Sequence, residues 1–169
     1  MTDAFKIRPA RTSDVTEIRR LVKPLADERV LLEKEAVAYF EGIQEFRVAE
    51  TPEGEVVGCG AVHVMWEDIA EVRTLATAAH WRGRGVGHAL LDELIGAARD
   101  LGVSRVFCLT FEVDFFTRHG FEVMADQSAV DPEVYSELLR STDEGVAEFL
   151  DLARVKPNTL GNTRMIRSL

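Results

Sequence analysis

The sequence predicts an α/β fold built as one domain. Along the chain, apolar residues recur with strand or helix spacing in the order β-α-α-β-β-β-α-β-α-β. A glycine-rich segment, residues 82–87, joins the fourth expected strand to the helix that follows it. With 169 residues, of which 46% are hydrophobic, the chain can bury one core, so we expect a single domain over residues 1–169.

The first half of the chain predicts one strand, two helices and then three strands. Residues 5–10 form the expected first strand, and Thr12-Ser13-Asp14 offers an N-cap for the helix after it. Apolar residues at helical spacing indicate the two helices, with Ile18, Leu21, Val22 and Leu25 in the first and Val37, Phe40 and Ile43 in the second. Strands are expected at 44–50, 56–65 and 69–77, with a turn at 51–55.

The second half predicts a long helix, two further strands and a less regular tail. The helix after the glycine-rich segment is indicated by apolar residues at helical spacing, namely Val86, Leu90, Leu94, Ala97 and Leu101, and Gly102 ends it. A strand at 105–110, a short helix ended by Gly120 and a strand from Phe121 follow. In the tail we expect a helix at 132–139 and a closing strand at 164–169, whereas 145–152 is ambiguous.

The glycine-rich segment predicts a phosphate-binding loop. Gly83, Gly85 and Gly87 let the backbone adopt conformations that a Cβ would forbid, so that successive N–H groups can point into one concavity. The positive end of the following helix lies at the same place. No Gly-Lys-Ser/Thr ends the segment, and it does not follow the first strand, which argues against a Walker loop and a dinucleotide fold.

Two spaced motifs identify a family. Arg82-x-x-Gly85-x-Gly87 resembles the acyl-CoA-binding motif Arg/Gln-x-x-Gly-x-Gly/Ala of the GCN5-related N-acetyltransferases (GNAT), and 115–121 resembles the second motif of that superfamily. The resemblance implies the GNAT fold, a mixed central sheet flanked by helices, and acetyl-CoA as co-substrate without a metal. The expected cofactor-binding residues are Leu75, Ala76, Thr77, Arg82, Gly83, Arg84, Gly85, Val86, Gly87 and Phe116.

Composition narrows the partners and the location. A formal net charge of −9 argues against non-specific nucleic-acid binding, and no apolar run approaches the roughly 20 residues of a membrane span. The N-terminus lacks the apolar core of a signal peptide, so we expect a cytoplasmic protein. Cys59 and Cys108 both fall in strand-like runs and are interpreted as small buried hydrophobes rather than as a disulfide or a catalytic pair.

Glu71 is the candidate general base. N-acetylation needs a neutral amine, and a carboxylate can take its proton directly or through water. Strand alternation places Glu71 and Arg73 on one face, so an alternative is a structural pair of neighbouring charges. The GNAT resemblance favours the base, because its members often carry a glutamate at this point. Their proton-donating tyrosine is replaced here by Phe116, so the general acid stays unassigned, with Thr110, water or unassisted departure as alternatives.

A narrower resemblance covers nearly the whole chain. Residues 30–34, 43–46, 57–61, 70–76, 116–121 and 156–164 are similar to the acetyltransferase domain of N-acetylglutamate synthases, most of all to the short stand-alone synthases of actinobacteria. This resemblance implies an enzyme that acetylates the α-amine of L-glutamate in a ternary complex, the first step of arginine biosynthesis. It does not extend to an amino-acid-kinase-like domain, so the arginine-regulatory site of that domain is not carried over.

Glutamate carries two carboxylates, so its pocket needs cationic or multiple-donor side chains. The expected substrate-binding residues are Leu32, Lys34, Arg73, Thr110, Lys156, Asn158, Asn162 and Arg164, although each cation could equally be an ordinary surface charge. Other acceptors stay open, namely glutamine, a polyamine or a protein N-terminus, as does a non-catalytic acyl-CoA sensor. A homodimer is a further open possibility.

Overall fold

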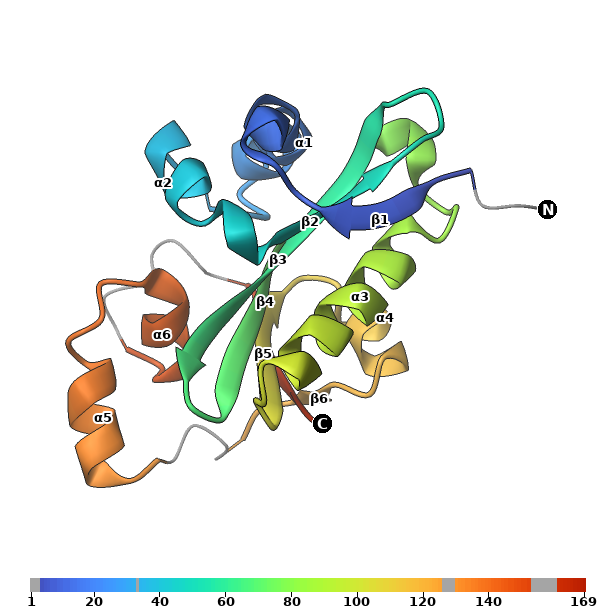
Figure 1. The fold of residues 1–169 in the computed structure, drawn as a ribbon. Helices are drawn as coiled ribbons and strands as arrows, with labels where there is room; N and C mark the ends of the chain where they lie inside the picture. The colour runs from blue at the N-terminus through green and yellow to red at the C-terminus, as the bar shows by residue number, and fades with distance from the viewer. Residues whose placement is uncertain (1–3, 33, 126–129, 153–160) are drawn as a thin grey trace. The chain divides into compact units, whose positions relative to one another are not determined.

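The computed structural model describes residues 4–32, 34–125, 130–152 and 161–169. Figure 1 labels its helices and strands. The strands are β1 (Lys6–Pro9), β2 (Phe46–Glu50), β3 (Val56–Trp66), β4 (Ile69–Thr77), β5 (Arg105–Thr110), β6 (Glu122–Val123) and β7 (Thr163–Ser168). The α-helices are α1 (Val15–Asp27), α2 (Ala36–Glu41), α3 (Val86–Asp100), α4 (Val113–Arg118), α5 (Pro132–Leu138) and α6 (Glu144–Phe149).

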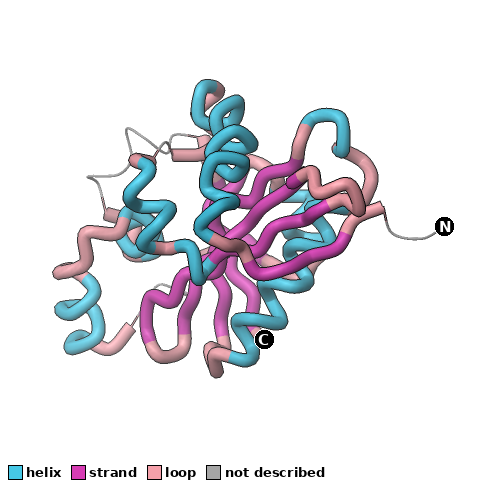
Figure 2. Tube along the Cα trace, turned by 45° about the horizontal axis from the view of Figure 1, so that its top comes forward, coloured by secondary structure: helices cyan, strands magenta, loops and turns pink. Residues whose placement is uncertain are grey.

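The seven strands form one mixed sheet in the order β1-β2-β3-β4-β5-β7-β6 (Figure 2, magenta). β1, β2 and β3 pair antiparallel in sequence, whereas β4 and β5 run parallel. The last strand, β7, pairs antiparallel with both β5 and β6 and so lies between them. The mixed sheet with its helices confirms the expected fold class, and β7 confirms the expected closing strand.

The chain packs as two compact units. Unit 1 contains the residues up to His63 and Val72–Ala98, and unit 2 contains Val64–Glu71 and Arg99–Leu169. Strands β3 and β4 therefore contribute residues to both units. One domain over residues 1–169 stays a prediction.

In unit 1, α1 presents the expected apolar stripe to the sheet. Ile18 is fully buried and Val22 nearly so, against β2 and β3 residues such as Val48. The second helix differs from the expectation. Val37 and Phe40 on α2 are 59% and 49% exposed, whereas Tyr39 is 2% exposed and packs against Phe46. Tyr39 is therefore the residue that anchors this short helix, and the apolar spacing found in the sequence marks its outer side.

In unit 2, an apolar cluster joins the strands to the tail helices. Phe107 of β5 packs edge-on against Phe149 of α6, and both are fully buried. The segment 145–152, ambiguous in the sequence, thus contains a helix whose apolar residues, such as Val146 and Phe149, pack into this cluster. Asp143 caps α6 by accepting a hydrogen bond from the Val146 N–H at 3.0 Å.

The two expected helix ends in the second half are glycines with left-handed backbones. Gly102 (φ +88°) follows α3, and Leu101, expected in the apolar stripe, lies beyond the helix and is 59% exposed. At the end of α4, the Gly120 N–H bonds to the Thr117 carbonyl and the Phe121 N–H to the Phe116 carbonyl. These two hydrogen bonds close the helix and confirm Gly120 as its end.

Candidate active site

The glycine-rich loop of unit 1 has the backbone that the sequence predicts. Gly83 and Gly85 have φ angles of +78° and +84°, and a Cβ added at either would meet nothing within 4 Å. Their need for glycine is therefore conformational rather than steric. The Ala89 N–H donates to the Gly85 carbonyl at 3.0 Å, so Gly85 stands at the start of α3. The first N–H groups of a helix have no partner inside it and can bind an anion.

Trp81, just before the glycine-rich loop, anchors this loop to the core of unit 1. Trp81 is 8% exposed and packs edge-on against Phe5, with ring centroids 6.1 Å apart. The guanidinium of Arg84 lies over the Trp81 ring at 4.7 Å, a cation–π contact that holds the loop to its anchor. The local sequence does not predict this arrangement, because Phe5 meets Trp81 only in the folded chain.

A close approach of α3 to the sheet sets the position of the helix start. A Cβ at Gly58 would lie 2.6 Å from Val86 Cγ1 and 2.9 Å from Leu90 Cδ1. Gly58 thus lets the first turn of α3 pack directly on β3. Val86 and Leu90 are buried at this contact, so the helix N-terminus is rigidly supported.

The last residues of β4 lead into the loop through an irregular backbone. Thr74 is left-handed, with a φ of +57°, which is rare for a β-branched residue and interrupts the strict alternation expected along this strand. Strained backbone of this kind costs about 1–3 kcal/mol and persists where the surroundings enforce it. The buried thiol of Cys59 donates to the Thr74 carbonyl at 3.4 Å. Sequence reasoning did not anticipate this feature.

A groove of about 250 Å³ borders the end of β4 in unit 1. Thr77 and Ala78 line one side, and Arg20 and Leu21 of α1 line another. Arg82, the first residue of the acyl-CoA motif, also lines it. The groove therefore joins two expected cofactor-binding segments, the end of β4 and the glycine-rich loop.

In unit 2, Glu71 is a buried acid on β4. It is 6% exposed and pairs in register with Phe107 of β5, which in turn pairs with Ile166 of β7. Partners in register point to the same side of a sheet, so Glu71 shares its face with this apolar row. Burial and the Glu71 charge both raise the pKa of the Cys108 thiol well above its ordinary value.

The two cysteines are structural, as expected. Both are buried and neither forms a disulfide. Burial raises the pKa of Cys59 to about 12, so its thiol stays protonated at neutral pH, and the same holds for Cys108. Neither is activated as a nucleophile.

Two further expected site residues belong to unit 2. Phe116 of α4 is 5% exposed and stacks edge-on with Phe115 and Phe121, with centroids 5.1 Å away in each case. Thr110 ends β5, and its hydroxyl oxygen accepts a hydrogen bond from the Glu112 N–H at 2.7 Å. The threonine O–H is left able to donate, but this hydroxyl is too weak an acid to serve as a ready proton donor.

The expected acceptor-binding residues divide between the units. In unit 1, Leu32 and Lys34 precede α2 and Arg73 lies on β4, all half-buried. In unit 2, Arg164 of β7 is half-buried, and its Nε and Nη2 groups donate to the Glu148 and Phe149 carbonyls of α6 at 2.8 and 2.5 Å. Lys156 and Asn158 lie outside the described residues.

Asn162 has an unusual side chain. Its Oδ1 atom is buried and accepts no hydrogen bond from the residues that the structure describes. Just before it, Gly161 (φ +89°) lies against the Phe111 ring, where a Cβ would be 3.2 Å from Cε1. A buried acceptor without a donor is costly, and a ligand N–H would satisfy it.

Within each unit, the structure brings together part of the expected site. Unit 1 joins Leu75–Thr77 with the 82–87 loop, and unit 2 contains Glu71, Thr110, Phe116, Asn162 and Arg164. Among the described ranges, the structure contains no group of His, Cys, Asp and Glu suited to a metal ion. The helices of the same ranges include none long and apolar enough to cross a membrane.

Comparison with known proteins establishes the class. Residues 15–121 match the model of the acetyltransferase (GNAT) family. The chain therefore belongs to the GNAT family, as its two motifs predict. Among relatives, a Mycobacterium tuberculosis protein named amino-acid acetyltransferase is 54% identical over 95% of this chain and 92% of its own. An amino-acid acetyltransferase of Neisseria meningitidis is 32% identical over 73% of this chain and 29% of its own.

Solved structures agree with the family assignment. The M. tuberculosis protein Rv2747, crystallised with CoA and NLQ, superposes with a TM-score of 0.92 at 53% identity, covering 97% of this chain and 99% of that one. The N-acetylglutamate synthase of Neisseria gonorrhoeae, crystallised with coenzyme A and N-acetyl-glutamate, gives a TM-score of 0.78 at 23% identity. It is covered over 36% of its length, and this likeness concerns the fold.

Proposed function

We propose that this protein is an amino-acid N-acetyltransferase that moves the acetyl group of acetyl-CoA to the α-amine of L-glutamate. The observation that carries the proposal is the 82–87 loop, whose left-handed Gly83 and Gly85 precede the N-terminus of α3. The loop suits the diphosphate of coenzyme A. The relative named amino-acid acetyltransferase, 54% identical over almost the whole chain, supports an amino acid as the acceptor.

The residues of unit 1 bind and orient the donor. Main-chain N–H groups of residues 82–87 would hold the diphosphate, and Arg82 beside the groove of about 250 Å³ would add a positive charge. The left-handed Thr74 redirects the strand just before Leu75–Thr77. N–H groups of Leu75–Thr77 would then polarise the thioester carbonyl and stabilise the oxyanion that forms on it.

Glu71 would serve as the general base. The amine must lose a proton before or as it attacks the thioester carbon, and a carboxylate acting directly or through water contributes roughly 10²–10⁴-fold to the rate. A tetrahedral intermediate forms, and its collapse breaks the C–S bond and releases the thiolate of coenzyme A. The identity of the group that protonates this thiolate is not assigned, because Phe116 has no proton to give.

The acceptor side would use cations and one amide. Lys34 and Arg73 are the cations proposed to pair with the two carboxylates of glutamate. Arg164 would add to them through Nη1, since its Nε–Nη2 edge is occupied by the α6 carbonyls. The buried Oδ1 of Asn162 would accept a hydrogen bond from the acceptor amine. Lys156 and Asn158 stay predicted members of this set, and glutamine stays the nearest alternative acceptor.

A coupled thiol-release assay tests the proposal. Purified protein is given acetyl-CoA and a panel of free amino acids, polyamines and a peptide with a free N-terminus, and release of coenzyme A is followed. We expect acetyl transfer to glutamate with a kcat/KM at least tenfold above that for the polyamine and the peptide. A higher value for glutamine would reassign the acceptor. No release with any amine, despite coenzyme A binding, would leave the protein a sensor and overturn the proposal.

A further inference from the structure

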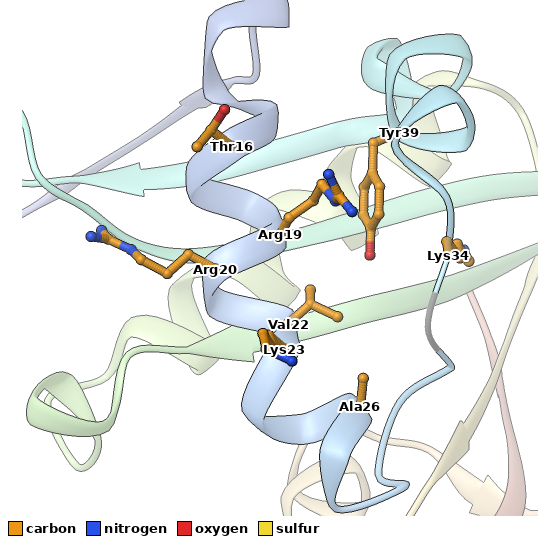
Figure 3. A pocket seen from close by; sticks show the side chains of 8 residues that line it. All are labelled: Thr16, Arg19, Arg20, Val22, Lys23, Ala26, Lys34 and Tyr39. Atoms are coloured by element: carbon orange, nitrogen blue, oxygen red, sulfur yellow. The ribbon is translucent and has the colours of Figure 1, made fainter.

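A second cavity in unit 1 lies away from the glycine-rich loop, in the groove between α1 and the segment that leads into α2. Its volume is about 310 Å³, at the lower end of the range of pockets that hold small molecules. Figure 3 shows the side chains that line it. Val22 and Ala26 of α1 form an apolar part of the lining, and Tyr39 of α2 stands on the opposite side.

The lining is strongly cationic for this chain. Four of the eight lining residues are lysine or arginine and none is acidic, although the protein has 29 acidic against 20 basic residues. Arg19 and Lys23 are four residues apart on α1 and so occupy the same side of the helix, and Lys34 lines the cavity from the segment that leads into α2. Like charges at this spacing repel one another, and an anion between them would remove that cost.

The ion pairing of Arg19 and Lys23 leaves both charges able to bind a ligand. Lys23 contacts Asp27 at 3.4 Å, but both side chains are more than half exposed, so the pair contributes little. Arg19 forms no ion pair with any residue in the described ranges, and Figure 3 shows its guanidinium pointing toward the Tyr39 ring. Arg20, by contrast, pairs with Glu17 and points away from Tyr39.

We propose that this α1–α2 groove is a second binding site, for a small anion with two or more negative charges such as a phosphate or a polycarboxylate. Arg19, Lys23 and Lys34 supply the charge, and Tyr39 forms the wall toward which the Arg19 guanidinium points. An anion here would also hold the Lys34 ammonium in the groove and away from the amino-acid acceptor. Occupancy therefore raises the KM for the amino-acid acceptor, a consequence that rests on the proposed acceptor role of Lys34.

Calorimetric titration tests the binding. Inorganic phosphate and citrate are titrated separately into the full-length protein at low ionic strength, with coenzyme A at saturation so that the 82–87 loop is occupied. We expect one-to-one binding that weakens about tenfold in Arg19→Gln/Lys23→Gln, which removes two partly screened charges. The control Arg99→Gln/Arg140→Gln removes two exposed cations elsewhere, one on α3 and one just after α5, and should change the affinity less than twofold. The anion that binds more tightly identifies the ligand class.

Equal phosphate and citrate affinities in the wild type and the Arg19→Gln/Lys23→Gln variant, or no binding of either anion to the wild type, would overturn the site. Circular dichroism shows that each variant is folded before it is titrated. The regulatory consequence has its own readout: the acceptor KM should rise about threefold with bound phosphate in the wild type and not in the double variant. The titration needs no acetyl transfer, so failure of the proposed function leaves the binding result interpretable, and the reverse also holds.

Discussion

The glycine-rich loop of unit 1 and the proposed site residues of unit 2, Glu71 and Arg164, are built in different ways. The loop works through its backbone: left-handed Gly83 and Gly85, the start of α3 and the Trp81 anchor. The unit 2 residues work through side chains, with Glu71 buried on β4 and Arg164 held by two carbonyls of α6. A site made of backbone groups can be recognised from residue types at a fixed spacing in the sequence. A site made of side chains forms only when the fold brings distant residues together.

This difference predicts different consequences of mutation. Changes in the loop should alter the binding of coenzyme A, and changes at Glu71 or Arg164 should alter the chemical step or the binding of the acceptor. Three substitutions, at Glu71, Gly85 and Arg164, test that separation, and Gly58→Ala and a thiol probe test the packing of the core that supports both regions.

Glu71→Gln should lower kcat at least a hundredfold and leave both KM values within about threefold, because the amide is isosteric but cannot take a proton. Steady-state kinetics with acetyl-CoA and glutamate measure this. Glu67→Gln, at an exposed glutamate in the turn before β4, is the matched control and should be neutral. A near-normal kcat for Glu71→Gln would remove this residue from the mechanism.

Gly58→Ala should destabilise the protein by about 2 kcal/mol, since the added Cβ would overlap Val86 Cγ1 and Leu90 Cδ1 at the start of α3. Gly96 lies on α3, and a Cβ added there would meet nothing within 4 Å. Gly96→Ala should therefore stabilise the protein by about 0.5–1 kcal/mol. Urea unfolding followed by circular dichroism measures both. The same sign for the two variants would contradict the tight contact between α3 and β3.

Gly85→Ala should raise the KM for acetyl-CoA about tenfold, because a left-handed alanine costs about 1–2 kcal/mol and the loop would relax away from its binding shape. Gly54→Ala is the matched control, with a φ of +89° and equally open surroundings in the turn between β2 and β3. Both variants should lose similar stability, but only Gly85→Ala should lose affinity for coenzyme A. If both variants lowered the affinity for coenzyme A equally, the 82–87 loop would not be its binding site.

Arg164→Lys should raise the KM for glutamate about fivefold and change the KM for acetyl-CoA less than twofold. Lysine keeps the charge but cannot bond two carbonyls of α6 and a carboxylate in one plane. Arg140→Lys, at an exposed arginine paired with Glu137 on α5, is the control. Arg164 would have only a structural role if the glutamate KM stayed constant while the melting temperature fell.

The thiol probe should show no effect on the native protein. With the pKa of Cys59 raised to about 12 and that of Cys108 also raised by burial, neither thiol should react with Ellman's reagent at pH 8. Both should react after denaturation in guanidinium chloride. Fast labelling of the native protein would show that the core around β3 and β5 opens readily, and it would also add a background to the thiol-release assay.

The sequence predicts most of the elements and the backbone of the glycine-rich loop well, for a physical reason. Gly83 and Gly85 permit a left-handed backbone, and the apolar stripe of α3 favours a helix, so both are signals that can be read from the local sequence. Local signals were wrong where tertiary packing determines which side of a helix is buried. The apolar spacing of α2 indicated Val37 and Phe40, whereas the buried residue is Tyr39.

The acceptor side was predicted mainly through family resemblance. Nothing in the local sequence shows that Arg164 donates to the end of α6, because Glu148 and Phe149 meet it only after β7 joins the sheet. The left-handed Thr74 is equally hidden, since threonine is a typical strand residue and only the folded strand enforces the conformation. The cationic groove combines residues of α1 with Lys34 and Tyr39, which are brought together by the packing of α2.

A titration of ¹⁵N-labelled protein with coenzyme A, followed by amide NMR, tests directly whether the 82–87 loop binds the diphosphate. We expect the largest shifts at the N–H groups of Gly83, Gly85, Val86 and Gly87, because a diphosphate there would accept their hydrogen bonds. The amide of Gly54, left-handed in a turn between β2 and β3, should stay unmoved. Saturable binding that leaves the loop amides unshifted and perturbs another region would show that coenzyme A does not bind at the 82–87 loop.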